Sequence, residues 1–557
     1  MRGITAEGRI GQSLNRAVAL FPSMPGLSQT LRALNQNPYV GSVGVFLGAG
    51  IATLNGRLIS VGLPDLRGAL RLGVDEASWI PTAYNMAMMF IGPFSVFLGG
   101  LLGVRRVLLW STAIFILCSL LLPFSPNLGV MLGLQVVSGL SSGTFYPLTF
   151  SYAARALPLR YVVYAIGVYP LDIVGSTSLA VPLEAWLTEY LSWHWIFWMS
   201  ALITPLMMLC IYLAIPNPPK HAGPKPTLSW RGFLYGCLGL ALIYGALDQG
   251  ERLDWLNSGV IVALLATGVF LLVATVIRRW LSPNPLVNPM FLANRNTLIL
   301  GACLFSFRFA LLAIAFLIPA LLGVTQGYRP LETGRAMLWL IVPLILGGLI
   351  SVQLMRRFDN RLVLAMGFTI MAAACLLNAR LTSVWARDNF FTSQIVMGCG
   401  LALSFTGLVS LLVQNVIDLG GLSSPFNVLT YSAFVHTVRL FGGESGSALM
   451  QHLVSVREKF HSSMIGLHVS SGDWLTDERV KMLTGGLLPN SSGIKDAQGR
   501  AVELLGRQVK VQAYTLAYAD GFLVIAFVAA MTVILAASMK RIKYYFDAPS
   551  PQAPKQS

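Results

Sequence analysis

Ionisable side chains interrupt the apolar stretches of this chain, and their chemistry is the most distinctive in the sequence. They lie within or at the end of runs of apolar residues: Arg57, Asp172, Glu184, Arg308, His436, Arg439 and Glu444. If these runs cross a membrane, a bare charge at mid-depth costs on the order of 3 kcal/mol or more. Each of these residues is therefore a candidate for proton transfer, ion pairing or substrate binding.

Asp172 is the foremost candidate for carrying a proton. It stands near the middle of its apolar run, directly after Tyr169-Pro170, where a proline predicts a kink. A carboxylate in a low-dielectric site can take up and release a proton, and a nearby arginine opposes the uptake. The alternative is a permanent structural pair between Asp172 and an arginine.

Glu444 and Glu184 are further candidates for proton coupling. Glu444 lies among glycines, which permit close contact between helices; they are Gly442, Gly443 and Gly446. Glu184 stands at the outer end of its run, and its alternative role is simply to reach water. Arg439 is interpreted as a structural or gating clamp, and His436 as a packed polar residue.

Arg57 and Arg308 suggest a preference among substrates. Cationic side chains in a transport cavity suit weak acids, fatty or aromatic carboxylates and anionic drugs. The alternative is that neighbouring carboxylates neutralise both arginines and leave no preference.

The elements that position these residues are membrane-spanning helices. Of the 557 residues, 55% are apolar and only 11% are charged, against roughly 25% charged in ordinary globular domains. Apolar runs of about 20 residues have the length that crosses a bilayer. The net charge of +16 does not indicate nucleic-acid binding, because basic residues at helix ends set the orientation in a membrane.

We place fourteen spans along the chain. The expected bounds are 40–63, 79–100, 105–124, 128–152, 161–183, 193–215, 229–248, 256–280, 297–322, 335–355, 361–379, 390–414, 424–450 and 517–539. The loop at 452–516 lies outside. Its start and end are expected to prolong the adjacent helices, and its middle to be irregular because it is rich in Gly and Ser.

Orientation follows from the basic residues, most of which fall on one side of the predicted spans. This bias places both termini in the cytoplasm, and we expect the chain to lie in the inner (cytoplasmic) membrane.

Four short motifs, in order along the chain, resemble those of one transporter family. Residues 54–64 (L-N-G-R-L-I-S-V-G-L-P) are similar to its L-D-x-T-I-V-N-x-A-L-P, and residues 192–197 (S-W-H-W-I-F) to its S-W-R-W-I-F. Residues 247–255 (L-D-Q-G-E-R-L-D-W) resemble its acidic turn between two central helices, and residues 439–446 (R-L-F-G-G-E-S-G) its R-x-L-G-G-x-x-G. The chain thus resembles the fourteen-helix drug:proton antiporters of the major facilitator superfamily, EmrB/QacA type.

This resemblance implies an all-α fold of two six-helix bundles with two central extra helices, in which the bundles rock around a central site. The implied domains are a cytoplasmic N-terminal extension (1–39), a six-helix bundle (40–215), two additional helices (229–280), a second six-helix bundle with the outer loop 452–516 (297–539) and a cytoplasmic tail (540–557). Spans 1, 4, 9 and 12 would line the cavity, and spans 2, 5, 10 and 13 would meet at the bundle interface. The aromatic residues Phe145 and Tyr146 are candidates for contact with an apolar ligand.

The sequence also departs from the family pattern. Asn55 replaces the carboxylate of span 1, and Gln135 replaces the arginine of R-x-x-Q-G in span 4; both remain cavity candidates. The cytoplasmic loop motif is reduced to Gly103, Arg105 and Arg106, and the two arginines are candidates for a gating or structural role.

No motif in the chain indicates an enzyme. There is no phosphate-binding G-x-x-x-x-G-K-[ST] sequence, no metal-ligand spacing of Cys and His, and no nucleophile–base motif, so we expect no cofactor and no metal.

The sequence predicts a proton-coupled exporter of amphipathic small molecules or drugs, within a multidrug efflux system. The alternatives are an importer of organic anions, or a passive channel or receptor derived from a transporter. The outer loop offers a surface for a periplasmic adaptor protein; a loop that docks only on its own helices is the alternative.

Overall fold

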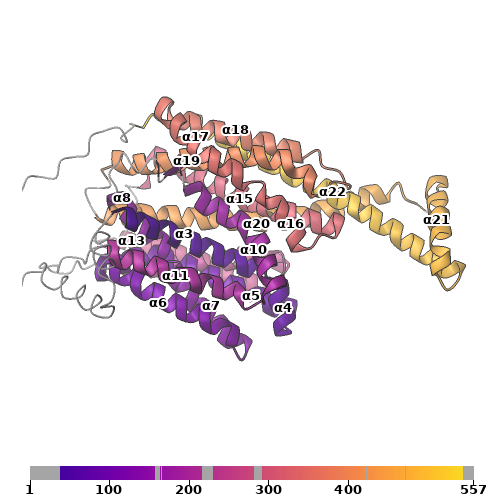
Figure 1. Cartoon of the computed structure of the whole chain (residues 1–557), viewed down its shortest axis with the longest axis horizontal. Coiled ribbons are helices and arrows are strands. Elements are labelled where there is room, and N and C mark those ends of the chain that lie inside the picture. The colour runs from indigo at the N-terminus through magenta and orange to yellow at the C-terminus, as the bar shows by residue number, and fades with distance from the viewer. Residues whose placement is uncertain are drawn as a thin grey trace, which may run out of the picture.

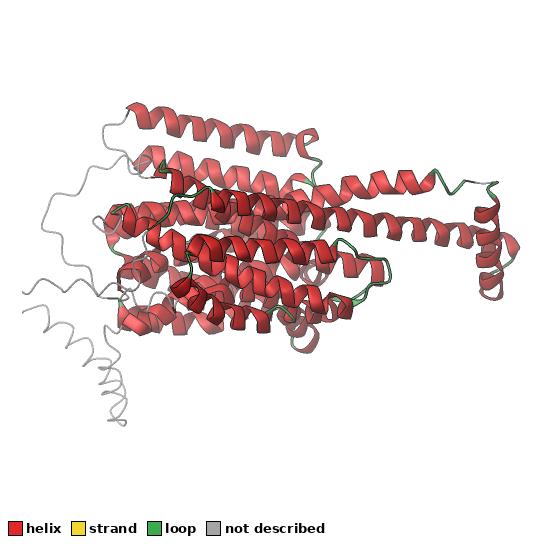
Figure 2. Cartoon of the chain, turned by 90° about the horizontal axis from the view of Figure 1, so that it is seen from above, coloured by secondary structure: helices red, strands yellow, loops and turns green. Residues whose placement is uncertain are grey.

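The structure is a computed structural model that describes residues 38–156, 164, 166–167, 169–215, 230–281, 292–420, 425–470 and 472–542. The described residues form helices joined by turns, with no strand. The helices run side by side along one direction, as Figures 1 and 2 show. The expected all-α architecture is confirmed. The predicted terminal segments before residue 38 and after residue 542 lie outside the described residues.

Apart from part of the fifth span (161–163, 165 and 168), which lies outside the described residues, the helices of the first half overlap the first six expected spans. They are α3 (Pro38–Val61), α5 (Val74–Leu102), α6 (Val104–Leu121), α7 (Leu128–Ser142) with α8 (Phe145–Ala156), α10 (Ser176–Tyr190) and α11 (Trp195–Ala214). A short helix, α4 (Leu63–Leu70), follows α3 at the end of the bundle.

The second half also contains six successive spans. Its helices are α15 (Arg295–Gln326), α16 (Pro330–Leu338) with α17 (Ile341–Arg357), α18 (Asn360–Asn378), α19 (Phe391–Asp418), α20 (Pro425–Gly466) and α22 (Ile494–Ala537). Between the halves come α12 (Trp230–Gly250) and α13 (Gly259–Leu281). Ten helical stretches within the described residues are long and apolar enough to cross a membrane. The other four expected spans coincide with α5, α10, α12 and α20, which lie among them.

Three prolines coincide with irregularities in the helices. Pro147 and Pro343 lie in the first turns of α8 and α17, just after the breaks that separate these helices from α7 and α16. A proline ring clashes with the carbonyl group four residues earlier, so a helix tends to stop before it. After Pro170 the backbone forms a π-helical turn, Leu171–Gly175, at the kink that the sequence predicts. Asp172 lies in this turn.

Buried apolar side chains form two clusters, one for each half of the chain. One cluster is built mainly from residues 51–215, and the other mainly from residues 300–542. Tyr146, Tyr169 and Ile173 come from the first half but are buried in the second cluster. The two halves therefore meet around α8 and the π-helical turn. The division into the predicted domains stays a prediction.

The additional helices do not form a separate layer between the halves. α12 packs against α5 and α20, and α13 packs against α12. Many apolar side chains of α13 are exposed, for example Phe270 at 69% and Val276 at 55%. α13 is thus positioned to face lipid, whereas α12 lies against both halves.

The outer loop is more regular than the sequence predicts. α20 and α22 extend beyond the bundle as a helical hairpin, and α21 (Trp474–Leu487) lies across its tip (Figures 1 and 2). The prolonged helices agree with expectation, but an irregular middle is wrong for residues 474–487. Asp473 caps α21 by accepting a hydrogen bond from the backbone nitrogen of Thr476, a capping signal that outweighs the local Gly and Ser content.

Candidate substrate cavity

A cavity of about 320 Å³ lies where α3, α5, α12, α15 and α20 meet. It extends from the middle of α3 towards the end of the bundle that carries α4 and α21. Its charged and aromatic lining residues are Arg57, Tyr244, Asp248, Arg252, Arg308, Arg439 and Glu444. Spans 1 and 9 (α3 and α15) line it as the family layout implies. The remaining lining residues come from α5, α12 and α20, with Leu63 at the start of α4 and Arg252 just after α12, and spans 4 and 12 supply none to this cavity.

Two arginines from the second half lie side by side in the wall. Arg308 on α15 is 5% exposed, and its Nε donates a hydrogen bond to the backbone oxygen of Arg439 at 3.3 Å. Its Nη1 has no hydrogen-bond partner. Arg439 on α20 is 3% exposed and holds its guanidinium carbon 4.0 Å from the centroid of the Tyr146 ring. Its Nε and Nη1 also lack hydrogen-bond partners. The cavity wall thus contains buried cationic groups with unsatisfied hydrogen-bond donors.

Two carboxyl groups lie together on the opposite side of this cavity. Oε2 of Glu444 accepts a hydrogen bond from the hydroxyl of Tyr244 at 2.6 Å. The hydroxyl of Thr82 on α5 donates to Oδ2 of Asp248. The side chains of Asp248 and Glu444 lie within hydrogen-bonding reach of each other, with Arg57 close enough to act on both through its charge.

The ion pairs that the sequence suggested between span arginines and carboxylates are not formed in this structure. No ion pair among the described residues joins Arg57, Arg308 or Arg439 to a carboxylate. Asp172 lies outside the cavity lining, next to Gly50 of α3, and its Oδ2 has no hydrogen-bond partner. Arg439 is the cation close enough to act on it.

Glu184 is fully buried in α10 rather than exposed to water. Its carboxyl group lies beside Asp65 of α4, and a methyl group on Gly62 would stand 2.9 Å from its Oε1. It does not line the cavity. Both oxygens of Glu184 lack a hydrogen-bond donor within the described part of the chain.

The other cavity candidates of the first half are buried within the bundle instead. Oδ1 of Asn55 accepts a hydrogen bond from the hydroxyl of Ser200 at 2.7 Å, which ties α3 to α11. Gln135 is fully buried on α7, and neither atom of its amide has a hydrogen-bond partner. Phe145 packs edge-on against Phe115.

The glycines around Glu444 bring α20 into close contact with α15. A methyl group on Gly442 or Gly446 would lie 2.7 or 2.2 Å from the backbone oxygen of Phe305 or Phe309. At Gly443 it would meet Leu312. Because the backbones approach so closely, the position of Glu444 is fixed relative to Arg308.

His436 and the cytoplasmic arginines lie away from the cavity lining. His436 is buried between Tyr146 and Gly92 of α5, and neither ring nitrogen has a hydrogen-bond partner. Arg105 donates from Nη2 to the backbone oxygen of Tyr212 at 2.7 Å and also lies over the ring of that residue. Arg106 is exposed. Arg105 thereby links α6 to the end of α11.

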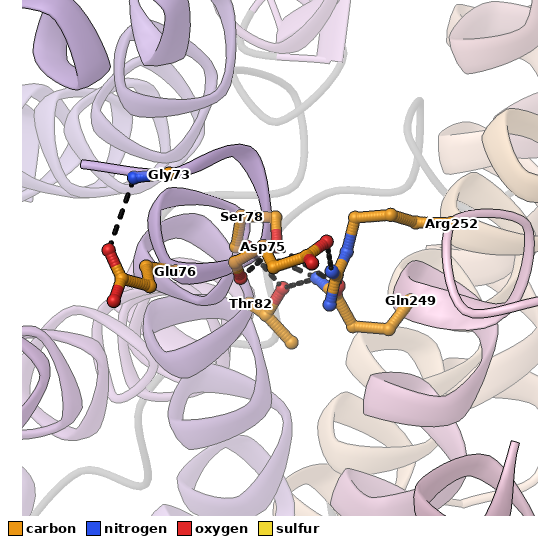
Figure 3. A network of polar contacts seen from close by, with 7 residues as sticks. All are labelled: Gly73, Asp75, Glu76, Ser78, Thr82, Gln249 and Arg252. Carbon is orange, nitrogen blue, oxygen red and sulfur yellow. Dashed lines mark hydrogen bonds and ion pairs between the residues drawn. The ribbon is translucent and has the colours of Figure 1, made fainter.

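Residues at the rim connect α12 to its neighbours. Figure 3 shows the polar network between α5 and α12, in which Ser78 and Thr82 contact Gln249, and Arg252 pairs with Asp75. Just beyond α12, Oε2 of Glu251 lies 2.6 Å from Nδ1 of His452 on α20. Burial acts to raise the pKa of Glu251, but hydrogen bonds from His452 and Trp255 outweigh it and hold the pKa below its ordinary value.

Tyr244 and Asp248 are lining residues that the sequence did not single out. Asp248 was assigned to a turn between the central helices, but it lies in the last turn of α12 and faces Glu444. Tyr244 and Asp248 are four residues apart, so their side chains share one face of a helix. This spacing is the sequence signal that could have identified them as neighbours in one site.

Comparisons with known proteins identify the family of this chain. A family model described as the Major Facilitator Superfamily matches residues 45–443. The probable multidrug resistance protein EmrY of Escherichia coli is 27% identical over 417 residues, 74% of this chain and 79% of that protein. The fatty acid resistance protein FarB of Neisseria gonorrhoeae is 22% identical over 486 residues, 84% of this chain and 90% of that protein.

A solved structure supports the same fold. The crystal structure of the human organic anion transporter MFSD10 aligns with 88% of this chain and 99% of that chain, with a TM-score of 0.52 and 14% identity. The family match, the relatives and the arrangement of the helices agree with one another, and this chain belongs to the Major Facilitator Superfamily.

Proposed function

We propose that this chain is a proton-coupled exporter of amphipathic small molecules that favours weakly acidic or anionic compounds. The cavity carries the proposal. Three buried or half-buried arginines, Arg57, Arg308 and Arg439, face two adjacent carboxyl groups, those of Asp248 and Glu444. The charge of these five groups is +1 when both carboxyls are ionised and +2 when one holds a proton. An anionic head group would be attracted in either state.

The names of the relatives support the same proposal. Multidrug resistance proteins of the EmrY and EmrB type suggest export of varied apolar molecules. The fatty acid resistance protein FarB suggests amphipathic carboxylates in particular. Apolar wall residues such as Ala52, Met88 and Leu312 would contact the tail of such a molecule, while the arginines hold its head.

Protons are proposed as the energy source, and Asp172, Glu184 and Glu444 remain the predicted coupling candidates. Of these three, only Glu444 lines the cavity.

We propose that the chain lies in the inner membrane with both termini in the cytoplasm. In this orientation the cavity extends towards the outer side of the membrane.

The central test is transport by purified protein in proteoliposomes with an imposed pH gradient. A suitable probe is a dansyl-labelled alkyl sulfonate, because the sulfonate stays ionised and a pH gradient does not move it passively. A dansyl-labelled alcohol of equal chain length serves as the neutral counterpart. We expect sulfonate transport against its gradient that stops when an uncoupler is added. Flux that is insensitive to the uncoupler would support a passive channel, and transport in the opposite direction would support an importer.

Arg308→Gln tests the anionic preference within the same assay. The variant should lose at least tenfold in sulfonate affinity and retain affinity for the neutral alcohol, since only the charged head group requires the guanidinium. Equal losses for both probes would overturn the preference while leaving export itself intact. Asp172→Asn, measured alongside, tests the coupling role predicted for that residue.

We further propose that the outer hairpin is the docking surface for a periplasmic adaptor protein. Its tip exposes large apolar side chains, including Leu467 at 73%, Trp474 at 72% and Ile494 at 70%. Replacing residues 467–493 with a short Gly/Ser linker should leave proteoliposome transport unchanged and abolish resistance in cells. Unchanged resistance would mean that the tip contacts no partner needed for export.

A further inference from the structure

The helix α12, one of the two additional helices, forms a wall of the cavity rather than a spacer between the halves. It lies against α5 on one side and α20 on the other. Its residues Tyr244, Asp248 and Gln249 line the cavity, and Tyr244 is only 4% exposed. A methyl group on Gly245 would lie 2.5 Å from the sulfur atom of Met86, so α12 also packs tightly on α5.

Polar contacts attach α12 to the first half of the molecule. Nε2 of Gln249 donates to the backbone oxygen of Ser78 at 3.1 Å, and the hydroxyl of Ser78 donates to Oε1 of Gln249 at 3.3 Å. The hydroxyl of Thr82 donates to Asp248, and Arg252 pairs with Asp75. Figure 3 shows the contacts of Asp75, Ser78 and Thr82 with Gln249 and Arg252. We expect α12 to move with α5 as one body.

Across the cavity, α12 meets the second half at Glu444. The hydroxyl of Tyr244 donates to Oε2 of Glu444, and the carboxyl group of Asp248 lies within hydrogen-bonding reach of the same residue. One carboxyl group is thus held on the side of α5, and the other is held on α20 by the close packing of α20 against α15. The pair spans the boundary between the two halves.

A hydrogen bond between two carboxyl groups requires a proton on one of them, because an ionised carboxylate can only accept. With one proton, the pair carries a single negative charge, which Arg57 on α3 can balance. The charged groups of the lining around the pair are Arg57 of α3, Arg308 of α15, Arg439 of α20 and Arg252 just after α12, and α5 contributes the hydroxyl groups of Ser78 and Thr82. When the halves separate, the two carboxyl groups move apart and the pair no longer holds its proton cooperatively.

We propose that Asp248 and Glu444 together bind the coupling proton, and that α12 couples proton binding to the relative movement of the two halves. In this step a proton from the outer solution forms one O–H bond on the pair, and that bond breaks when the proton leaves on the other side. This inference rests on the proposed proton-coupled function and assigns its site. It predicts that an additional helix takes part directly in coupling.

The test compares driven transport with exchange, using the same dansyl-labelled sulfonate in proteoliposomes. Asp248→Asn and Glu444→Gln should each reduce proton-driven accumulation at least tenfold. Exchange of probe across the membrane at equal pH on both sides should persist. Exchange requires the relative movement of the two halves but no net transfer of protons. The double variant should be no worse than either single variant, since the two residues bind one proton.

Matched controls keep the outcomes distinct. Asp254→Asn replaces an exposed carboxylate beyond the end of α12. The backbone φ there is 61°, which asparagine tolerates. This variant should leave coupling unchanged. Coupling that is retained in both Asp248→Asn and Glu444→Gln would overturn the inference, as would loss of coupling in Asp172→Asn alone. A wild-type protein without any proton-driven transport would instead overturn the proposed function. Thermal unfolding of each variant in detergent identifies any that fail to fold, and Asp248→Glu and Glu444→Asp then replace them with the expectation of partial coupling.

Discussion

The guanidinium carbon of Arg439 on α20 lies 4.0 Å from the centroid of the Tyr146 ring on α8. This contact joins the second half of the molecule to the first at the inner end of the cavity. Tyr146 in turn stacks on Tyr169, which lies one turn before Asp172. A ring that is packed on both sides holds Arg439 in place without a carboxylate partner.

We expect Tyr146→Leu to weaken this junction more than Tyr146→Phe. Loss of a buried cation–π contact costs about 2 kcal/mol, whereas phenylalanine keeps the ring that Arg439 faces. Thermal unfolding in detergent measures the stability, and sulfonate binding reports the position of Arg439. If the leucine and phenylalanine variants behaved alike, the ring would not be what positions Arg439.

Gly446→Ala should destabilise the protein. Its new methyl group would lie 2.2 Å from the backbone oxygen of Phe309, so α15 and α20 would have to move apart. Overpacking of this kind costs about 1–3 kcal/mol. Gly466→Ala is the matched control, because it lies at the end of the same helix with open space around it. An equal change in melting temperature for both variants would contradict the close helix contact.

The contact between Glu251 and His452 should depend on pH. Because the pKa of Glu251 is held below its ordinary value, the carboxylate stabilises the folded protein above that ordinary value. This stabilisation is lost as the pH falls through the lowered pKa. Wild type should therefore melt above Glu251→Gln at pH 6, and the difference should shrink once the pH falls below the ordinary glutamate value of about 4.3. A difference that grew on acidification would show that the pair is not ionic.

Asp520→Asn should loosen the outer hairpin. Oδ2 of Asp520 on α22 lies 2.6 Å from Nε of Arg457 and 2.8 Å from Nε2 of His461, both on α20. The variant should show faster amide exchange in residues 455–466 and faster cleavage by trypsin after Arg457, with little change in global stability. Asp496→Asn, which removes an exposed pair within one helix, is the control. Equal exchange rates in the two variants would exclude a clamp at Asp520.

The helices could be predicted from the sequence because their signals are local. A run of apolar residues fixes a span, and Pro147, Pro170 and Pro343 mark breaks that the structure shows. The middle of the outer loop was predicted less well, because the capping residue Asp473 was outweighed by the Gly and Ser composition around it.

The cavity could be predicted only in part, because its geometry is not local. Arg57, Arg308 and Glu444 were identified by the cost of a charge in an apolar run, and all three line the cavity. Asp248 was missed because it stands at the end of its span, where a charge is common. Asp172 was ranked first because it lies mid-span, but which way a mid-span residue faces depends on the packing of helices far apart in the sequence.

The outer hairpin has a mechanical consequence. α22 continues without interruption from Ile494 through the last span, and its 44 residues amount to about 66 Å of helix. The portion before residue 517 is about 35 Å long, so a tilt of about 10° in the span would swing α21 sideways by about 6 Å. The hairpin therefore converts a small tilt of the second half of the molecule into a larger displacement of α21. A pair of fluorophores, one at the tip and one on α4, would read the conformational state of the transporter from outside the membrane.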